Sequence, residues 1–163
     1  MLFDAVLLLK PDGVVSVEFP HLANLIREVQ FDTIYHEHYC YLSLLAVERI
    51  FAAHGLKVFD VEQLPTHGGS LRVLACRSTS TKHPEQAGLQ RVRGEEAAMG
   101  FDTIEAYQGF EPKVREVREQ LLRFLRDAKE KGYAVLGELP HREFVIAATC
   151  GQFLNTSIGE VHN

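Results

Sequence analysis

The chain has 163 residues, of which 46% are hydrophobic and 24% charged, with a formal net charge of −5. This composition fits one globular domain, or a small domain with part of another. It argues against a general nucleic-acid binder, and no apolar run reaches the about 20 residues of a membrane span. The N-terminus lacks a secretion signal. Three widely spaced cysteines give neither a disulfide framework nor a zinc pair, so we expect reduced thiols and a cytoplasmic location.

The first part of the chain predicts a strand followed by two helices. Residues 14–19 are β-branched and bounded by turn residues, which is typical of a strand. Residues 21–30 carry apolar side chains at helical spacing. Ser43 is placed to cap a helix over 43–54, and Gly55 stands where a left-handed residue ends a helix.

Two further strands with a glycine-rich turn follow. Residues 56–62 alternate apolar with polar side chains, and residues 71–76 resume as a strand after the turn at 65–70. So short a connection predicts an antiparallel hairpin. The composition then shifts to small polar residues at Ser78–Thr81, where we predict the domain boundary.

Beyond this boundary the chain predicts mainly helices, over residues 85–98 and 110–131. The second helix has one apolar face, formed by Val114, Val117, Leu121, Phe124, Leu125 and Ala128. Gly132 ends it, and residues 133–136 predict the start of a strand. A strand over 144–148 is also expected, whereas the remaining tail has no clear periodicity.

One stretch, residues 31–43, concentrates groups that transfer protons. Tyr35, Glu37 and His38 combine a phenol, a carboxylate and an imidazole within four positions. An imidazole titrates near neutral pH, a carboxylate can fix its tautomer, and a phenol can donate to a developing oxyanion. These three residues are therefore the candidate catalytic group.

Two other interpretations of this stretch stay open. His36 and His38 resemble the first two ligands of many metal sites, but no third ligand follows at an expected spacing. Cys40 stands where the zincin pattern requires its second histidine, so no metal is predicted. The same side chains can instead cap the next helix and satisfy buried backbone groups.

The glycine-rich turn is the second candidate site. Gly68 and Gly69 allow backbone N–H groups to approach an anion or a substrate, and Arg72 adds a positive charge. A tight hairpin turn without any ligand explains these residues as well. Isolated histidines such as His21 are predicted to be surface or structural.

These motifs resemble a known family. Residues 8–18 resemble the late part of a class I S-adenosylmethionine-dependent methyltransferase domain, where a turn leads into the fifth strand. The helix at 43–54 and the hairpin at 56–76 resemble its closing helix and its sixth and seventh strands. More specifically, Phe31–His38 together with Thr66–Arg72 resembles the sugar C-3 methyltransferases, which act on nucleotide-linked keto-deoxysugars.

The resemblance implies roles for the candidate residues. His38 would remove the proton from the carbon next to the ketone, while Tyr35 and Glu37 would position it and stabilise the enolate. That carbanion equivalent would attack the methyl group of S-adenosylmethionine. No residue is assigned to the cofactor. Substrate contacts are expected from Tyr41, His67, Gly68, Gly69, Ser70 and Arg72.

The expected fold class is α/β, with a partial Rossmann-like methyltransferase sheet over 1–78 and a helical segment over 79–163 that starts a second α/β domain. The zinc segment and the main cofactor loop of the family are absent from these residues, and the tail diverges after about residue 137. We therefore predict a truncated S-adenosylmethionine-dependent C-methyltransferase of a nucleotide-linked sugar. A separate possibility is that another chain supplies the missing N-terminal half. The alternative is a non-catalytic remnant or binding module that retains nucleotide-sugar affinity.

Overall fold

The computed structural model describes residues 6–34, 40–133, 144–149 and 152–157. The chain divides into two compact units, Met1–Glu111 and Pro112–Asn163. The described part is mixed α/β, which confirms the predicted fold class.

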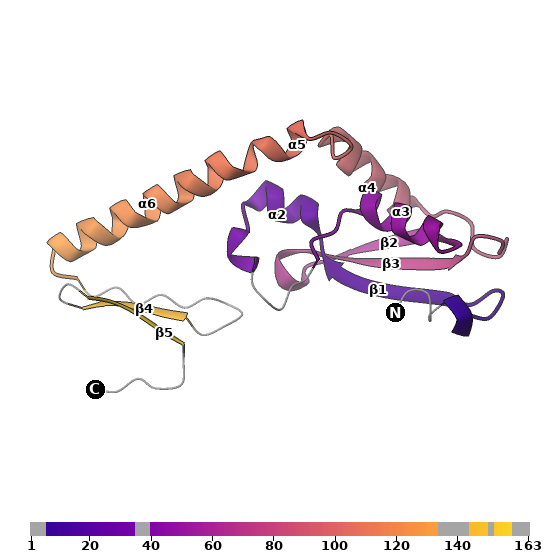
Figure 1. Cartoon of the computed structure of the whole chain (residues 1–163), viewed down its shortest axis with the longest axis horizontal. Helices are drawn as coiled ribbons and strands as arrows, with labels where there is room; N and C mark the ends of the chain where they lie inside the picture. The colour runs from indigo at the N-terminus through magenta and orange to yellow at the C-terminus, as the bar shows by residue number, and fades with distance from the viewer. Residues whose placement is uncertain (1–5, 35–39, 134–143, 150–151, 158–163) are drawn as a thin grey trace. The chain divides into compact units, whose positions relative to one another are not determined.

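The first unit is built on a three-stranded antiparallel sheet with the strand order β1-β3-β2 (Figure 1). Its strands are β1 (Val14–Pro20), β2 (Leu56–Leu64) and β3 (Ser70–Arg77). All three follow the sequence prediction, and the β2–β3 hairpin confirms the expected short antiparallel connection. A register shift between Val58 and Asp60 marks a bulge in β2.

Three helices accompany the sheet: α2 (Leu22–Glu28), α3 (Leu44–Ala53) and α4 (Ala87–Ala98). Helices α3 and α4 lie on one face of the sheet and both contact β2 (Figure 1). Ser43 caps α3 as predicted, because its Oγ accepts a hydrogen bond of 3.1 Å from the third amide of the helix. Gly55, with φ of 71°, follows the helix in the left-handed conformation expected of a C-cap glycine.

The main hydrophobic core fills the space between the sheet and these two helices. Strand residues alternate between the two faces of a sheet, so every second side chain of β3 points into this core. The buried members are Leu44, Val47, Phe51, Leu56, Val58, Val61, Leu71, Val73, Ala75, Leu89 and Val92.

A second, smaller cluster packs α2 against the residues that follow α4. Three apolar side chains of α2 are buried together with Phe101. The short helix α5 (Glu105–Gln108), which the sequence did not predict, adds Tyr107, whose ring stacks on Phe101 with centroids 5.5 Å apart. The domain boundary predicted at Ser78 stays a prediction. In this chain, residues on both sides of it share one compact unit.

The long helix α6 (Phe110–Glu130) closely follows its prediction, and Gly132 adopts a positive φ of 74° beyond its end. Its apolar face is covered only in part. Leu125 and Ala128 are buried, whereas Leu121 and Phe124 are exposed.

The second unit also contains an antiparallel hairpin of β4 (Phe144–Thr149) and β5 (Gln152–Ser157). The strand predicted over 144–148 is thereby confirmed. Most of the strand start predicted at 133–136 lies outside the described residues. No helix in the described ranges is long and apolar enough to cross a membrane. Cys40 and Cys76 are free thiols, exposed and buried respectively.

Candidate active site

The predicted catalytic residues Tyr35, Glu37 and His38 lie outside the described residues, so their arrangement stays a prediction. The structure does describe both ends of the segment that contains them. A 3₁₀ turn over Phe31–Thr33 precedes it, and the hydroxyl of Tyr41 donates to the carbonyl oxygen of Thr33 at 3.2 Å. This hydrogen bond brings the two ends of the segment together.

A second link closes the base of a longer excursion from the sheet. The chain leaves β1 at Pro20, forms α2 and the 3₁₀ turn, and returns at Leu42. There His21 and Leu42 form an isolated parallel bridge, and the amide of Leu22 donates to the carbonyl of Leu42 at 3.1 Å. Residues 22–42 are therefore closed at their base before α3 begins.

Glu96 of α4 lies at this base and is 3% exposed. Its Oε1 accepts from the amide of Leu44 at 2.6 Å, and its Oε2 accepts from the amide of Leu45 at 2.9 Å. These are the first two amides of α3, which have no partner within the helix. The positive end of the helix dipole also favours a carboxylate there.

The same carboxylate contacts the residue at the other end of the excursion. His21, 1% exposed, places its Nε2 at 2.8 Å from Oε1 of Glu96. Glu96 thus joins the residue before α2 to the first turn of α3. We name the side chains of His21 and Glu96, with the two amides of α3, the Glu96 junction.

The glycine-rich turn packs against the same excursion. The carbonyl of Gly68 accepts from Nε2 of Gln30 at 2.9 Å, and the carbonyl of Gly69 accepts from the amide of His21 at 3.0 Å. Gly69 has φ of 112°, a conformation that L side chains rarely adopt, and a Cβ at this position would meet the end of the Asn24 side chain. Any other residue would be strained here, and Asn24 would have to move.

The structure thus places the glycine-rich turn next to α2 and Gln30, and in the chain these residues lead into the predicted catalytic segment. Ser70 of the turn is buried, with its Oγ donating to the carbonyl of Thr66 at 3.0 Å. The side chain of His67 lies outside the described part, so its predicted substrate contact stays a prediction.

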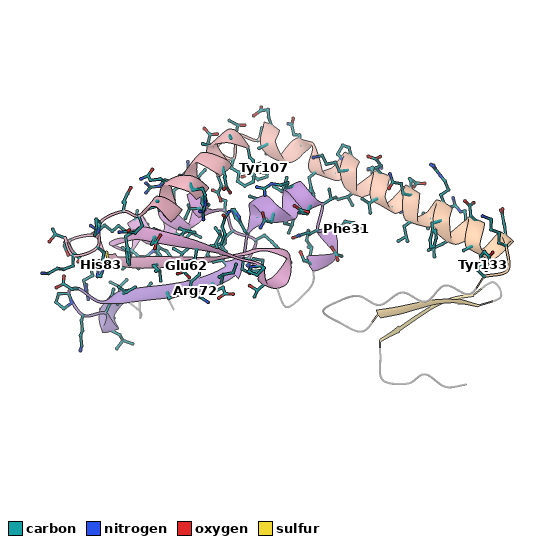
Figure 2. All side chains as sticks on the ribbon, turned by 180° about the vertical axis from the view of Figure 1, so that it is seen from behind. Phe31, Glu62, Arg72, His83, Tyr107 and Tyr133 are labelled. Atoms are coloured by element: carbon teal, nitrogen blue, oxygen red, sulfur yellow. The ribbon has the colours of Figure 1, made fainter. Side chains whose placement is uncertain are left out.

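Arg72 occupies the centre of a row of charges across the three strands. Its partners in register are Glu18 on β1 and Glu62 on β2. The guanidinium donates to both carboxylates, at 3.2 Å and 3.1 Å, and is 42% exposed (Figure 2). A substrate phosphate would have to compete with these two carboxylates, so the predicted substrate contact of Arg72 stays a prediction.

A separate ion-pair group joins α3 to α4. Arg93 donates to Glu48 at 2.6 Å and to Glu85 at 2.8 Å. The hydrogen bonds from Arg93 lower the pKa of Glu85 below its ordinary value. A pocket of about 310 Å³ lies beside this group, lined by three acids (Glu48, Glu96 and Asp102) and one arginine. This excess of negative charge disfavours a phosphate ligand in that pocket.

The described residues also bear on where a metal ion or the cofactor could bind. Across residues 6–34 and 40–133, no three His, Cys, Asp or Glu side chains gather as a metal site. S-adenosylmethionine in a Rossmann-like fold sits at a glycine-rich loop behind a parallel strand. The strand pairs among the described residues are antiparallel, so we assign none of these residues to the cofactor.

The sequence prediction missed the Glu96 junction. His21 was expected to be surface or structural, and it is structural because it is fully buried. The signal for Glu96 is its place in α4, where Leu89, Val92 and Glu96 form the buried stripe. A carboxylate at a position where helical spacing requires an apolar residue indicates that buried hydrogen-bond donors lie next to it.

Comparison with known proteins adds two findings. Residues 65–138 match the family described as the C-methyltransferase C-terminal domain. The chain is 35% identical over 145 residues to the C-methyltransferase NovU of Streptomyces niveus. The aligned region covers 88% of this chain and 34% of that protein. The chain thus spans about a third of the length of the curated relative that it matches.

Proposed function

Because the chain belongs to the C-methyltransferase family, we propose that it carries the substrate-side part of an S-adenosylmethionine-dependent C-methyltransferase. Its substrate is a nucleotide-linked keto-deoxysugar. The observation that supports this proposal is the contact between the glycine-rich turn and the two residues on either side of α2. Hydrogen bonds from Gln30 and His21 hold the glycine-rich turn against the excursion that contains the predicted catalytic segment.

In this proposal the reaction begins with loss of a proton from the carbon next to the ketone. His38 is the base, since an imidazole with a pKa near neutral both accepts and releases a proton at working pH. Tyr35 and Glu37 orient the imidazole and stabilise the enolate oxygen by hydrogen bonding. S-adenosylmethionine, when bound, supplies the methyl group.

Substrate contacts are assigned to the turn and its surroundings. Gly68 and Gly69 give close access to the backbone, and Ser70 is fixed beneath them by its hydrogen bond to Thr66. Tyr41 stands at the opposite end of the catalytic segment and packs against the cluster around α2. His67 and Arg72 complete the set as candidates for the polar groups of the sugar nucleotide.

The cofactor-binding part lies in the remainder of the enzyme, supplied either by the same polypeptide or by another chain. This division is consistent with the matched share of 34% of the curated relative. We expect the complete enzyme to work in the cytoplasm, where the cysteines stay reduced.

Calorimetric titration tests the proposal. The 163-residue chain is titrated with S-adenosylmethionine and then with a nucleotide-linked keto-deoxysugar. We expect saturable binding of the sugar nucleotide and none of the cofactor, and the control variant Glu95→Gln should bind the sugar nucleotide like the wild type. Absence of sugar-nucleotide binding would contradict the substrate assignment, and micromolar cofactor binding would contradict the proposed division.

A second candidate function is a binding module without catalysis that retains affinity for the nucleotide-linked sugar. Methyl transfer in a mixture with the cofactor-binding part of a relative separates the two. Activity that is lost in His38→Ala supports the enzyme, whereas sugar binding without transfer supports the binding module.

A further inference from the structure

The Glu96 carboxylate collects donors from two elements that are far apart in the sequence. Oε1 faces both Nε2 of His21 and the amide of Leu44, at 2.8 Å and 2.6 Å, and Oε2 faces the amide of Leu45 at 2.9 Å. Two of these three contacts come from backbone amides, which can only donate. The carboxylate oxygens therefore act as acceptors in both amide contacts.

The ring of His21 has one defined role in this arrangement. Its Nδ1 is buried and has no hydrogen-bond partner among the described residues. Nε2 faces a carboxylate oxygen, which accepts, so the geometry places a proton on Nε2 that donates to Glu96.

His21 also connects the junction to the glycine-rich turn. Its amide donates to the carbonyl of Gly69 at 3.0 Å, while its carbonyl accepts from the amides of Asn24 and Leu25 at the start of α2. One residue thus touches the turn, the beginning of α2 and, through Glu96, the beginning of α3.

Packing alone does not require a carboxylate at this position. A leucine or methionine at residue 96 would continue the buried stripe of Leu89 and Val92. It would leave the amides of Leu44 and Leu45 without acceptors and His21 without a partner, all in a buried place. The charged residue therefore serves to join the two helix beginnings.

We propose that Glu96 and His21 are positioning residues, which hold both ends of residues 22–42 at one point beside the glycine-rich turn, where the substrate contacts are proposed. The inference rests on the proposed function for its consequence in catalysis. The coupling of α2 to α3 through Glu96 does not depend on any substrate.

Hydrogen–deuterium exchange of the whole chain tests the coupling. The variants are Glu96→Gln and, as a matched control one residue away, Glu95→Gln, whose carboxylate contacts only Gln63 and Arg91 among the described residues. We expect amides of both α2 and the first turn of α3 to exchange about tenfold faster in Glu96→Gln and to be unchanged in Glu95→Gln. Faster exchange in α3 alone, or in neither helix, would overturn the proposal.

Two further readouts separate positioning from general support. In the wild type, long-range ¹H–¹⁵N spectra should show a proton on Nε2 of His21, and a ring protonated on Nδ1 alone would contradict the junction even if Glu96→Gln failed to fold. In a folded Glu96→Gln, the Kd for a nucleotide-linked keto-deoxysugar should rise about tenfold, and an unchanged Kd would refute the positioning role. If the wild type does not bind that sugar, the proposed function fails while the exchange result still decides the junction.

Discussion

The Glu96 junction and the row formed by Glu18, Arg72 and Glu62 use the same kinds of charged side chain in opposite surroundings. Glu96 is 3% exposed and its partners include two backbone amides, whereas Arg72 is 42% exposed and its partners are side chains. Water replaces a lost partner in the row but not in the junction. We therefore expect the buried carboxylate to set the position of chain segments and the surface row to contribute little to it.

The largest effect is expected from removing the buried carboxylate. Glu96→Ala leaves two helix amides and His21 without an acceptor, so the free energy of unfolding should fall by about 3–5 kcal/mol. Urea denaturation measures this change. The matched variant Glu95→Ala should stay within about 0.5 kcal/mol of the wild type. Equal, small losses of unfolding free energy in Glu96→Ala and Glu95→Ala would show that the buried carboxylate stabilises the fold no more than the one beside it.

The next largest effect concerns the glycine-rich turn beside the junction. Gly69→Ala places a Cβ at a φ of 112° and against the side chain of Asn24, so we expect a loss of about 1–3 kcal/mol in unfolding free energy. Gly94→Ala is the control, because it lies in α4 with open space around it. That variant should gain about 0.5–1 kcal/mol. The two alanine variants should therefore shift the urea midpoint in opposite directions, and a shared direction would contradict this account of the turn.

A smaller effect is expected at the half-exposed pair of Arg93 and Glu85. The pKa of Glu85 is lowered in the folded state by hydrogen bonds from Arg93, so the pair stabilises the fold above the ordinary carboxyl range. This contribution, about 0.2–1 kcal/mol at an exposed site, is lost as the pH falls through the lowered pKa.

Urea denaturation at several pH values checks this sign. The stability difference between the wild type and Arg93→Gln should shrink on going from neutral pH to below 4.5, the ordinary pKa of a glutamate. Glu85→Gln removes the titrating group and should weaken this pH dependence. A difference that grows toward acid pH would show that the assigned direction is wrong.

The smallest effect is expected at the surface row. Arg72→Gln should lower the unfolding free energy by only about 0.2–1 kcal/mol, because all three side chains remain hydrated. Its effect on sugar-nucleotide affinity is a separate measurement, since Arg72 is a proposed substrate contact. A loss of unfolding free energy above about 2 kcal/mol would contradict this expectation, because it would show that the exposed row stabilises the fold as a buried pair does.

Local patterns in the sequence were sufficient for most of the elements. The β-branched run of β1, the alternation in β2 and the helical spacing of α3 and α6 each depend on neighbours within a few residues. The cap at Ser43 and the left-handed Gly55 were predictable for the same reason.

Features that depend on distant contacts were not predictable in this way. The pairing of β1 with β3 joins residues 50 (Pro20 with Ser70) to 62 (Val14 with Cys76) positions apart, and the bulge between Val58 and Asp60 interrupts the ladder of β2 with β3. The partners of Glu96 lie 51–75 positions away, so no local pattern names them. Of the candidate site, the sequence indicated both motifs but not the contacts of Glu96, and the trio Tyr35, Glu37 and His38 stays a prediction.

A double-mutant cycle between His21 and Glu96 tests whether the two side chains of the Glu96 junction stabilise each other. The unfolding free energies of the wild type, His21→Leu, Glu96→Gln and the double variant give the coupling between the two side chains. Because they meet in a buried place at 2.8 Å, we predict a coupling energy of about 1–3 kcal/mol. Additivity within about 0.5 kcal/mol would show that the two residues act independently, and the Glu96 junction would then not hold the two helix beginnings together.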